Sequence, residues 1–339
     1  MRGKFKIELK KIAMLYGGVD TDRIIMIFEP DETDRLRRAE TSDIRNRLAR
    51  QISMFVGDED ERMTSLPGLS FAKVRKPMPR SSYLYEPSIS MIVRGSKRVQ
   101  LGGTTYLYDE SRFLLTSVDL PTVTEVLEAT EASPYLSLLM RLNLPVAREM
   151  IAEMGGPEAP LPGGTTGMST GPATVDLFDA IERLVRLLDH PQDLEHIGAL
   201  IQREIIYRIL TSPAGARFRQ TVMLGTRSQR TAKAISWLRD NYAQSMSIAN
   251  LAEHAGMGIS TLHHHFREIT SMSPLQYQKH LRLHEARRIL RSENVDAAIA
   301  ALRVGYESPT QFNREYRRMF GASPIQDVTS FRMSQSGLD

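Results

Sequence analysis

Between Leu66 and Leu144 the chain alternates apolar and polar residues in short runs. The segment SISMIVRGSKRVQLGGTTYLYDESRFLLTS, residues 88–117, shows this alternation and is interrupted by Gly95, Gly102 and Gly103. Period-two runs separated by glycine turns are typical of antiparallel hairpins, because successive side chains of a strand point to opposite faces. The runs TVTEVLEA and YLSLLMRLNL add further strands. About eight short strands predict a small antiparallel barrel or jelly roll.

Before this region, the apolar spacing is that of a helix. Ile44, Leu48 and Ile52 recur every four residues and predict a helix over residues 42–54. The surrounding segment is charged and weakly patterned. We therefore expect residues 1–62 to be a partly helical N-terminal extension, and residues 63–154 to be the β-domain.

After the β-domain we expect a linker and a pair of helices over residues 155–211. GGPEAPLPGGTTGMSTGPA, at 155–173, is rich in Gly, Pro, Ser and Thr, which is typical of a loop. Two apolar stripes at helical spacing follow, namely Leu177, Ile181, Leu184, Val185 and Leu188, then Ile197, Leu200, Ile201, Ile205 and Ile209. The two helices could pack on their own domain or form a dimer face. The basic, poorly patterned residues 212–229 predict a second linker.

The C-terminal third contains an internal repeat. HFREITSMSP (265–274) and EYRRMFGASP (315–324) align without gaps, so that an aromatic residue, an arginine and a Ser-Pro pair recur in register. Each copy follows a short helical segment and a glycine turn, at Gly256 and Gly305. Two short helices joined by such a turn predict a helix-turn-helix motif, whose second helix enters the major groove of DNA. SPLQYQKHLRLHEARRIL, between the copies, predicts one long connecting helix with Leu283, Ala286 and Leu290 buried.

The charge distribution singles out the same region. Residues 226–332 hold 15 Lys and Arg against 9 Asp and Glu, whereas the rest of the chain holds 29 against 31. A basic third beside a near-neutral remainder suggests binding to a polyanion, although a solvated arginine-rich surface would look the same. Together with the repeat, the charge leads us to expect that residues 226–332 bind DNA on their own.

The repeat region resembles the AraC-type transcription regulators. The resemblance rests on LAEHAGMGISTLHHHFREITSMSPLQYQKHLRLHEARRIL and VGYESPTQFNREYRRMFGASP, which are similar to that family's two helix-turn-helix units and linking helix. YEPSISMIVRGSKRV and REIIYRIL resemble the cupin-like N-terminal effector domain of one branch. The resemblance implies an α+β protein: a cupin-like β-barrel or jelly roll with a helix pair, then an all-α DNA-binding domain over residues 230–330. It further implies a transcription regulator that binds double-stranded promoter DNA and responds to a small molecule; RNA polymerase and a second copy of the chain are further partners to expect.

The family's pattern assigns base-reading positions on each second helix. These are Ser260, Thr261, His263 and His264 in the first unit, and Thr310, Gln311, Asn313 and Arg314 in the second. Gln and Asn can each form two hydrogen bonds to adenine, and Arg can form two to guanine. Phosphates, which position the protein without specifying sequence, suit Arg267, Arg317 and Arg318. The first helix lacks the Arg or Gln that the family commonly has at its reading positions, which leaves its base specificity open.

Three adjacent histidines, His263, His264 and His265, raise the question of a metal site. Successive helical residues are about 100° apart, so the three fan over about 200° and cannot meet at one ion. We therefore expect neither a metal site nor a cofactor. With Leu262 and Phe266 buried, His263 and His264 point outward, either toward base edges or simply toward solvent, and His265 lies toward the rim.

An enzyme is the competing hypothesis. A cupin-type enzyme with an accessory DNA-binding domain needs metal-binding histidines in the barrel, but none occurs before His190. A DNA-alkylation repair protein with the same DNA-binding module needs an acceptor cysteine, and the sequence has no cysteine. We therefore expect no enzymatic activity.

The position of an effector site is only weakly indicated. Polar contacts could come from five residues near the first strands, namely Arg75, Arg80, Tyr83, Tyr85 and Glu86. Four strand residues could line a pocket or belong to the ordinary core, namely Val93, Val99, Tyr106 and Tyr108. The lack of cysteine, of a secretory signal and of an apolar run near the ~18 residues that span a bilayer predicts a cytoplasmic protein.

Overall fold

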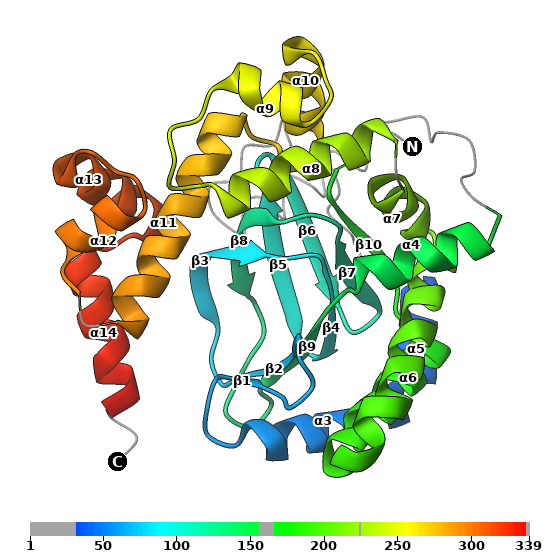
Figure 1. Ribbon diagram of the computed structural model, residues 1–339. Helices are drawn as coiled ribbons and strands as arrows, with labels where there is room; N and C mark the ends of the chain where they lie inside the picture. Colours follow the sequence, from blue (N-terminus) through cyan, green and yellow to red (C-terminus); the bar gives the residue numbers. More distant parts are fainter. Residues whose placement is uncertain (1–31, 156–165, 224, 294, 337–339) are drawn as a thin grey trace, which may run out of the picture.

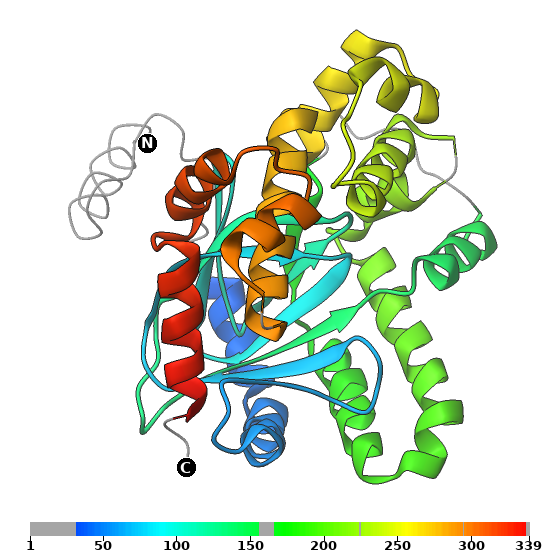
Figure 2. The same ribbon diagram turned by 60° about the vertical axis from the view of Figure 1, so that its left-hand side comes forward.

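The computed structural model of the chain describes residues 32–155, 166–223, 225–293 and 295–336. These residues form an antiparallel β-domain, a layer of helices against one of its sheets, and an all-helical C-terminal region (Figures 1 and 2). The predicted α+β class, with a β-rich N-terminal domain and a helix-turn-helix region, is confirmed. None of the helices in the described part of the chain is long and apolar enough to cross a membrane.

The β-domain consists of two antiparallel sheets that face each other. Six strands are ordered β1-β2-β9-β4-β7-β10 in one sheet, and four are ordered β3-β8-β5-β6 in the other. Their bounds are β1 Glu61–Met63, β2 Leu69–Val74, β3 Met78–Tyr85, β4 Ser88–Arg94, β5 Ser96–Leu101, β6 Thr104–Asp109, β7 Arg112–Thr116, β8 Leu120–Val126, β9 Tyr135–Arg141 and β10 Met168–Pro172.

Alternation along the strands separates two environments. In β4, Ile89 and Met91 lie in the core between the larger sheet and its covering helices. The intervening Ser90 points into the space between the sheets, where its hydroxyl lies 3.1 Å from the Tyr108 hydroxyl of β6. The period-two pattern thus directs apolar side chains to the helices and many hydroxyl groups to the barrel interior.

Residues 32–62 contain the helix predicted over residues 42–54, but they pack onto the β-domain and do not form a separate extension. Helices α2 (Glu32–Glu40) and α3 (Ser42–Val56) precede β1. Leu48, Ile52 and Val56 of α3 are buried against the larger sheet, because their helical stripe covers its apolar outer face. Residues 1–31 lie outside the described part of the chain.

Two predicted loops also contain regular structure. In the first, residues 168–172 form β10, which pairs with β7, while residues 156–165 lie outside the described part. In the second, residues 215–222 form helix α7 (Gly215–Val222), whose Phe218 and Val222 are buried at i, i+4 spacing. A single such pair is too short a pattern to distinguish a helix from a loop in the sequence.

The predicted helix pair follows β10. It consists of α5 (Val175–Arg186) and α6 (Pro191–Thr211), joined by a 3₁₀ turn at Leu187–Asp189. Together with α3 and α4 (Leu144–Glu153), the pair lies along one side of the β-domain (Figure 1).

Seven helices complete the described chain. They are α8 Arg227–Asp240, α9 Ile248–His254, α10 Ile259–Thr270, α11 Pro274–Ser292, α12 Ala297–Arg303, α13 Pro309–Phe320 and α14 Pro324–Ser336. We refer to α9 and α10 as unit 1, and to α12 and α13 as unit 2. The predicted linking helix is α11, and the two units lie toward its opposite ends (Figures 1 and 2).

Unit 1 shares its hydrophobic core with the barrel. Phe266, Ile269 and Tyr277 belong to the same buried cluster as Ile92 and Leu120 of the strands. This continuity was not predicted. An isolated fragment of residues 226–332 would expose the apolar side chains that the barrel covers.

A backbone hydrogen bond and a tight turn join the β-domain to the end of α10 in unit 1. The Gly167 amide donates to the Ile269 carbonyl at 3.0 Å. In the β5–β6 turn, Gly102 has a φ of +57°, and a Cβ there would collide with Ser271 at the end of α10. Only glycine permits both this backbone conformation and this close approach.

Candidate nucleic-acid interface

Helix α10 presents a polar face because its apolar stripe is fixed inward. Leu262 and Phe266 are fully buried. The four residues assigned to base reading in unit 1 are all exposed, namely Ser260, Thr261, His263 and His264. The predicted orientation of this helix therefore agrees with its burial pattern.

Helix α13 repeats the arrangement. Phe312 and Tyr316 are fully buried, and the four assigned residues are exposed, namely Thr310, Gln311, Asn313 and Arg314. The Gln311 side-chain amide donates to Glu315 one turn further on, at 3.3 Å. Arg314 forms no hydrogen bond or ion pair with any residue that the structure describes.

The structure separates arginines that hold the fold together from arginines that face solvent. Arg282 donates to the backbone carbonyls of Tyr242 and Gly305. Arg287 and Arg291 both bind the Asp327 carboxylate, from α11 to α14. By contrast, the three arginines assigned to phosphates are exposed and have no ion-pair partner among the described residues, namely Arg267, Arg317 and Arg318.

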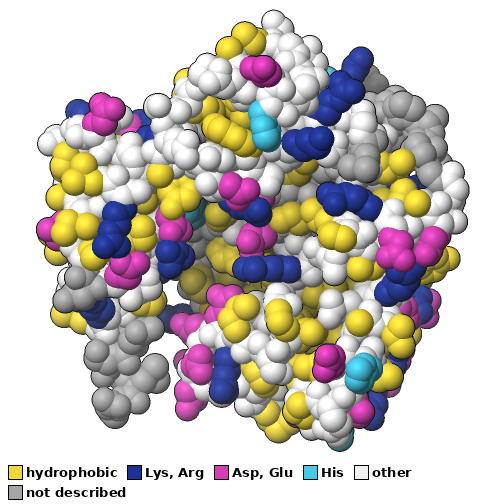
Figure 3. All heavy atoms as spheres, viewed as in Figure 1, with side chains coloured by type: hydrophobic (Ala, Val, Ile, Leu, Met, Phe, Trp, Pro, Cys, Tyr) yellow, Lys and Arg dark blue, Asp and Glu magenta, His cyan; other side chains and the backbone are white. Residues whose placement is uncertain are grey.

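Because several arginines of this region bind other parts of the chain, net charge alone does not locate a DNA-binding surface. On the face drawn in Figure 3, Lys and Arg side chains are interspersed with Asp and Glu and do not gather into one basic patch. Part of the charge excess of residues 226–332 is used internally. The exposed faces of α10 and α13 therefore delimit the candidate interface better than net charge does.

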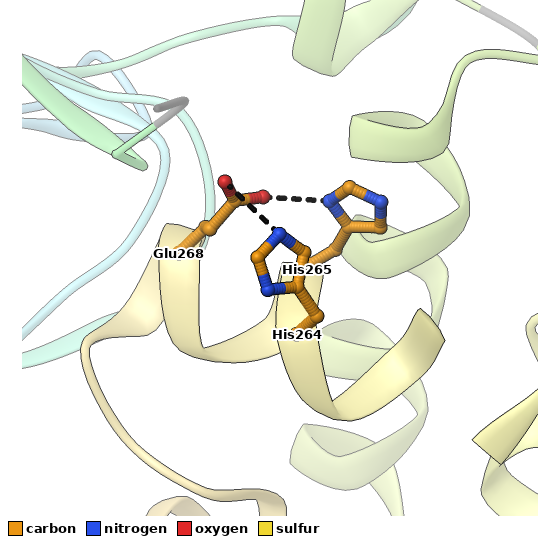
Figure 4. Close-up of side chains that lie close together, drawn as sticks. All are labelled: His264, His265 and Glu268. Carbon is orange, nitrogen blue, oxygen red and sulfur yellow. Dashed lines mark hydrogen bonds and ion pairs between the residues drawn. The ribbon is translucent and has the colours of Figure 1, made fainter. Parts of the chain in front are cut away.

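The histidines are arranged differently from our expectation. His263 stays apart, but His264 and His265 both turn toward Glu268 (Figure 4). Their nitrogen atoms and a Glu268 oxygen all lie within 4.8 Å of one another. Our sequence argument concerned the three histidines alone, and His263 indeed lies outside the group; it did not consider Glu268, the carboxylate one turn away.

The barrel interior holds a second cluster of polar side chains. The Lys97 ammonium donates to the Tyr85 hydroxyl at 3.0 Å. Burial raises the pKa of Tyr85, Tyr108 and Tyr135 well above the usual tyrosine value, so all three phenols stay protonated at neutral pH. Among the described residues, no hydrogen bond of normal geometry reaches the buried hydroxyl of Tyr135, whose interaction with the Ser137 side chain falls short of that geometry, and none reaches the hydroxyl of Thr116.

A pocket of about 730 Å³ opens beside this cluster. Its lining includes Gly95, Tyr108 and Val126. Tyr135 lies directly behind Gly95, where a Cβ atom would approach the Tyr135 ring to 3.1 Å. Of the interior cluster only Tyr108 lines this pocket, whose charged lining residues are Arg38, Asp109, Glu110, Arg112, Glu125 and Glu128.

The five predicted effector residues do not converge. Arg75 is bound to backbone carbonyls of residues 57–59, Arg80 pairs with Gln100 and Glu125, and Glu86 pairs with Arg141. Only Tyr83 and Tyr85 lie next to Lys97, which contacts both rings. Lys97 was missed, although its alternation with the buried Val99 and Leu101 was a signal that it faces inward.

Two family models match the chain. The model of the AraC-type transcriptional regulator N-terminus matches residues 65–217, and a helix-turn-helix domain model matches residues 251–328. Together they cover more than half of the chain, in the order that the fold shows. The chain belongs to the AraC-type transcriptional regulators.

Curated relatives of this AraC-type chain are named transcriptional activators. The activator RhaS of Salmonella paratyphi A is 28% identical over 151 residues, which are 44% of this chain and 53% of that protein. RhaS of Pectobacterium carotovorum subsp. carotovorum is 30% identical over 105 residues, which are 31% and 38% of the two chains. The AraC-type chain thus spans about half the length, or less, of these relatives.

Solved structures show the same fold over most of the AraC-type chain. An apo variant of ToxT from Vibrio cholerae has a TM-score of 0.54 and 11% identity, over 79% of this chain and 99% of that one. Wild-type ToxT with a bound unsaturated fatty acid has a TM-score of 0.53 and 10% identity, over 79% and 96%. At these identities the likeness concerns the fold alone.

Proposed function

We propose that the protein is a sequence-specific DNA-binding transcription regulator whose activity is set by a small molecule bound in the barrel. The observation that carries the proposal is the duplicated helix-turn-helix unit, in which α10 and α13 both turn a polar face outward from a buried aromatic anchor. Two units joined by one stiff helix can enter successive major-groove segments, ~34 Å apart, on one side of the duplex. One chain would then cover an asymmetric site.

The two units have different capacity for direct readout. In unit 2, Arg314 suits guanine, while Gln311 and Asn313 suit adenine and Thr310 can bond either base. In unit 1, the hydrogen-bonding groups are Ser260, Thr261, His263 and His264. We assign phosphate contacts to Arg267, Arg317 and Arg318, since their exposed guanidinium groups have no ion-pair partner in the part of the chain that the structure describes.

Selection of bound duplexes from a random DNA pool, using the full chain, tests this assignment. We expect a two-part motif whose halves are about one helical turn apart, with a guanine or adenine in the half read by unit 2. Binding should weaken steeply as salt rises, because phosphate contacts release counterions. Failure to enrich any sequence at low salt would contradict the proposal.

The effector site that we propose is the polar interior around Lys97 and Tyr135. A buried hydroxyl without a partner costs ~1–3 kcal/mol, so a ligand that accepts a hydrogen bond from Tyr135 would relieve this cost. A nearby ammonium favours a ligand with a carboxylate or another anionic group. The fatty acid bound by ToxT is such a ligand, in a protein of the same fold.

Thermal melting of the full chain tests the effector class. A panel of small carboxylates that includes an unsaturated fatty acid should contain members that raise the melting temperature. Lys97→Met should abolish that rise, whereas Lys76→Met, at an exposed position of the same domain, should preserve it. A rise that survives Lys97→Met would place the anion elsewhere.

A second copy of the chain and RNA polymerase complete the proposed partners. Helix α6 leaves Ile197, Leu200 and Tyr207 between 44% and 64% exposed, and these side chains would suit a homodimer face. Leu200→Glu should then shift a dimer toward monomer in light scattering.

The RhaS relatives are named transcriptional activators. RNA polymerase is the partner expected of an activator.

A further inference from the structure

One turn of the reading helix α10 gathers three metal-ligating side chains. The His265 Nδ1 atom lies 2.6 Å from Oε2 of Glu268, and the His264 Nε2 atom lies 3.4 Å from Oε1 (Figure 4). No other group of three or more His, Cys, Asp or Glu side chains in the described part of the chain brings its ligand atoms this close. The cluster lies at the surface, with the His264 side chain 69% exposed.

Helical geometry accounts for the convergence. Glu268 follows His264 by four residues and His265 by three, so at about 100° per residue it projects between them. The buried Leu262 and Phe266 fix the rotation of the helix. His263 projects about 100° away on the far side of His264 and takes no part. The three side chains therefore lie together on one side of the helix.

The donor set selects the kind of ion. Two imidazole nitrogens and one carboxylate oxygen suit zinc and its first-row neighbours, whereas calcium and magnesium prefer oxygen ligands alone. Zinc bonds to these donors are about 2.0–2.2 Å long, so two ligands of one ion lie up to about 4 Å apart, and the three ligand atoms here already lie within 4.8 Å of one another. Glu268 lies in the last turn of α10, where the helix dipole favours a cation.

We propose that His264, His265 and Glu268 form a site for a divalent transition-metal ion of the zinc class, placed so that the bound ion competes with base reading by unit 1. Three protein ligands leave further coordination positions to water, so the ion exchanges more freely than at a closed four-ligand structural site. The bound ion holds His264 away from base edges. This consequence for DNA rests on the proposed function, whereas the metal site itself does not.

Zinc titration of the tag-free full chain, followed by calorimetry, tests the site without DNA. One equivalent of zinc should bind. Removing a residue that only hydrogen-bonds to a metal ligand already costs ~10–100-fold in metal affinity. His264→Ala and Glu268→Gln each remove a ligand itself, so each should weaken zinc binding by at least about tenfold. The control is His263→Ala, the exposed neighbour, which should bind zinc like the parent chain. Cobalt(II) should give a visible spectrum that is lost with the same two variants.

Three results would overturn the metal site: no stoichiometric binding, binding that neither variant weakens, or equal weakening by His263→Ala. Glu268→Gln keeps the shape of the side chain, so misfolding would not explain its loss of zinc.

Duplex selection with and without zinc then tests the competition. We expect zinc to relax the preference in the half-site of unit 1 and to leave that of unit 2 unchanged. Identical preferences with and without zinc would contradict the competition. Failure of all sequence enrichment would instead contradict the proposed function.

Discussion

Unit 1 and unit 2 follow the same sequence pattern but are built into the molecule differently. The core of unit 1 continues into the β-barrel, through residues such as Phe266 and Tyr277. The buried core of unit 2 is a separate cluster around Phe312 and Tyr316, whose buried residues come from α11 onward and against which Tyr242, between α8 and α9, also packs. A change in the barrel can therefore reach unit 1 through a shared core, whereas unit 2 is connected through α11, through Tyr242 and through a smaller contact of α13 with β3.

The buried carboxylates beside the two units also differ in their surroundings. Asp119, in the β7–β8 turn, accepts from Arg239 of α8 through its carboxylate and from Tyr277 of α11 through its backbone carbonyl. Burial raises the pKa of Asp119, and Arg239 only partly opposes the shift. Burial would also raise the pKa of Asp327, but hydrogen bonds from Arg287, Arg291 and Tyr316 outweigh it and hold the pKa at about 2.

The comparison teaches that the barrel holds α8 and α11, the helices that flank unit 1, through a carboxylate that burial disfavours, while unit 2 is held by a well-compensated one. Burial disfavours the ionised form of Asp119, while Asp119 and Asp240 together outweigh the burial of Arg239 and raise the pKa of that arginine. At neutral pH the ionised Asp327 stabilises unit 2. A regulator built in this way can alter the position of unit 1 without unfolding unit 2.

The largest expected effect comes from removing the aromatic anchor of each unit. Phe266→Ala and Phe312→Ala should each cost ~3–5 kcal/mol, because each leaves a cavity in a packed core. In scanning calorimetry, Phe266→Ala should lower the melting temperature of the transition that includes the barrel. Phe312→Ala should lower only the melting temperature of the transition that belongs to unit 2. Equal displacement of one common transition by both variants would show that the two cores are not separate.

Acidification should affect unit 2 through Asp327. Its folded pKa of about 2 lies below the usual value of 3.8, so its stabilisation is present above pH 4 and is lost as the pH falls toward 2. The shift corresponds to about 2 kcal/mol. Asp327→Asn should remove this amount at pH 7 and flatten the dependence of unit 2 melting on pH between 4 and 2. An unchanged pH profile would contradict the assignment.

A smaller effect should follow from breaking the docking pair of unit 1. Arg239→Ala leaves the Asp119 carboxylate buried without its cation, which should cost roughly 1 kcal/mol in urea unfolding, since Arg239 is half exposed and its contacts are 3.3 Å long. Asp119→Asn removes the charge together with its need for a partner and should cost less. Should Asp119→Asn prove the more damaging of the two, the carboxylate would be a net stabilising group.

The features that depend on local spacing could be predicted from the sequence, whereas those that depend on long-range packing could not. The strands and both reading helices depend on local spacing, which Ile89 and Met91 or Phe312 and Tyr316 display directly. The shared core depends on segments far apart in the chain, such as Gly102 against Ser271, and no local pattern encodes such a contact. The metal-ligand cluster was visible in principle, because Glu268 stands at i+4 from His264. The lack of a hydrogen bond of normal geometry at the Tyr135 hydroxyl depends on packing and could not be foreseen.

The central claim is that the exposed face of α13 reads bases, and the selectivity of one variant tests it most directly. Duplex selection should be repeated with Arg314→Ala and with Arg317→Ala, the exposed arginine one turn further on. Arg314→Ala should lose the preference for guanine at one position, with a cost of ~1–3 kcal/mol at the selected site. Arg317→Ala should keep the motif, weaken all sequences about equally and lower the salt slope by ~0.9. If Arg314→Ala weakens specific and non-specific binding equally while the motif stays intact, the face of α13 positions the protein and does not read the sequence.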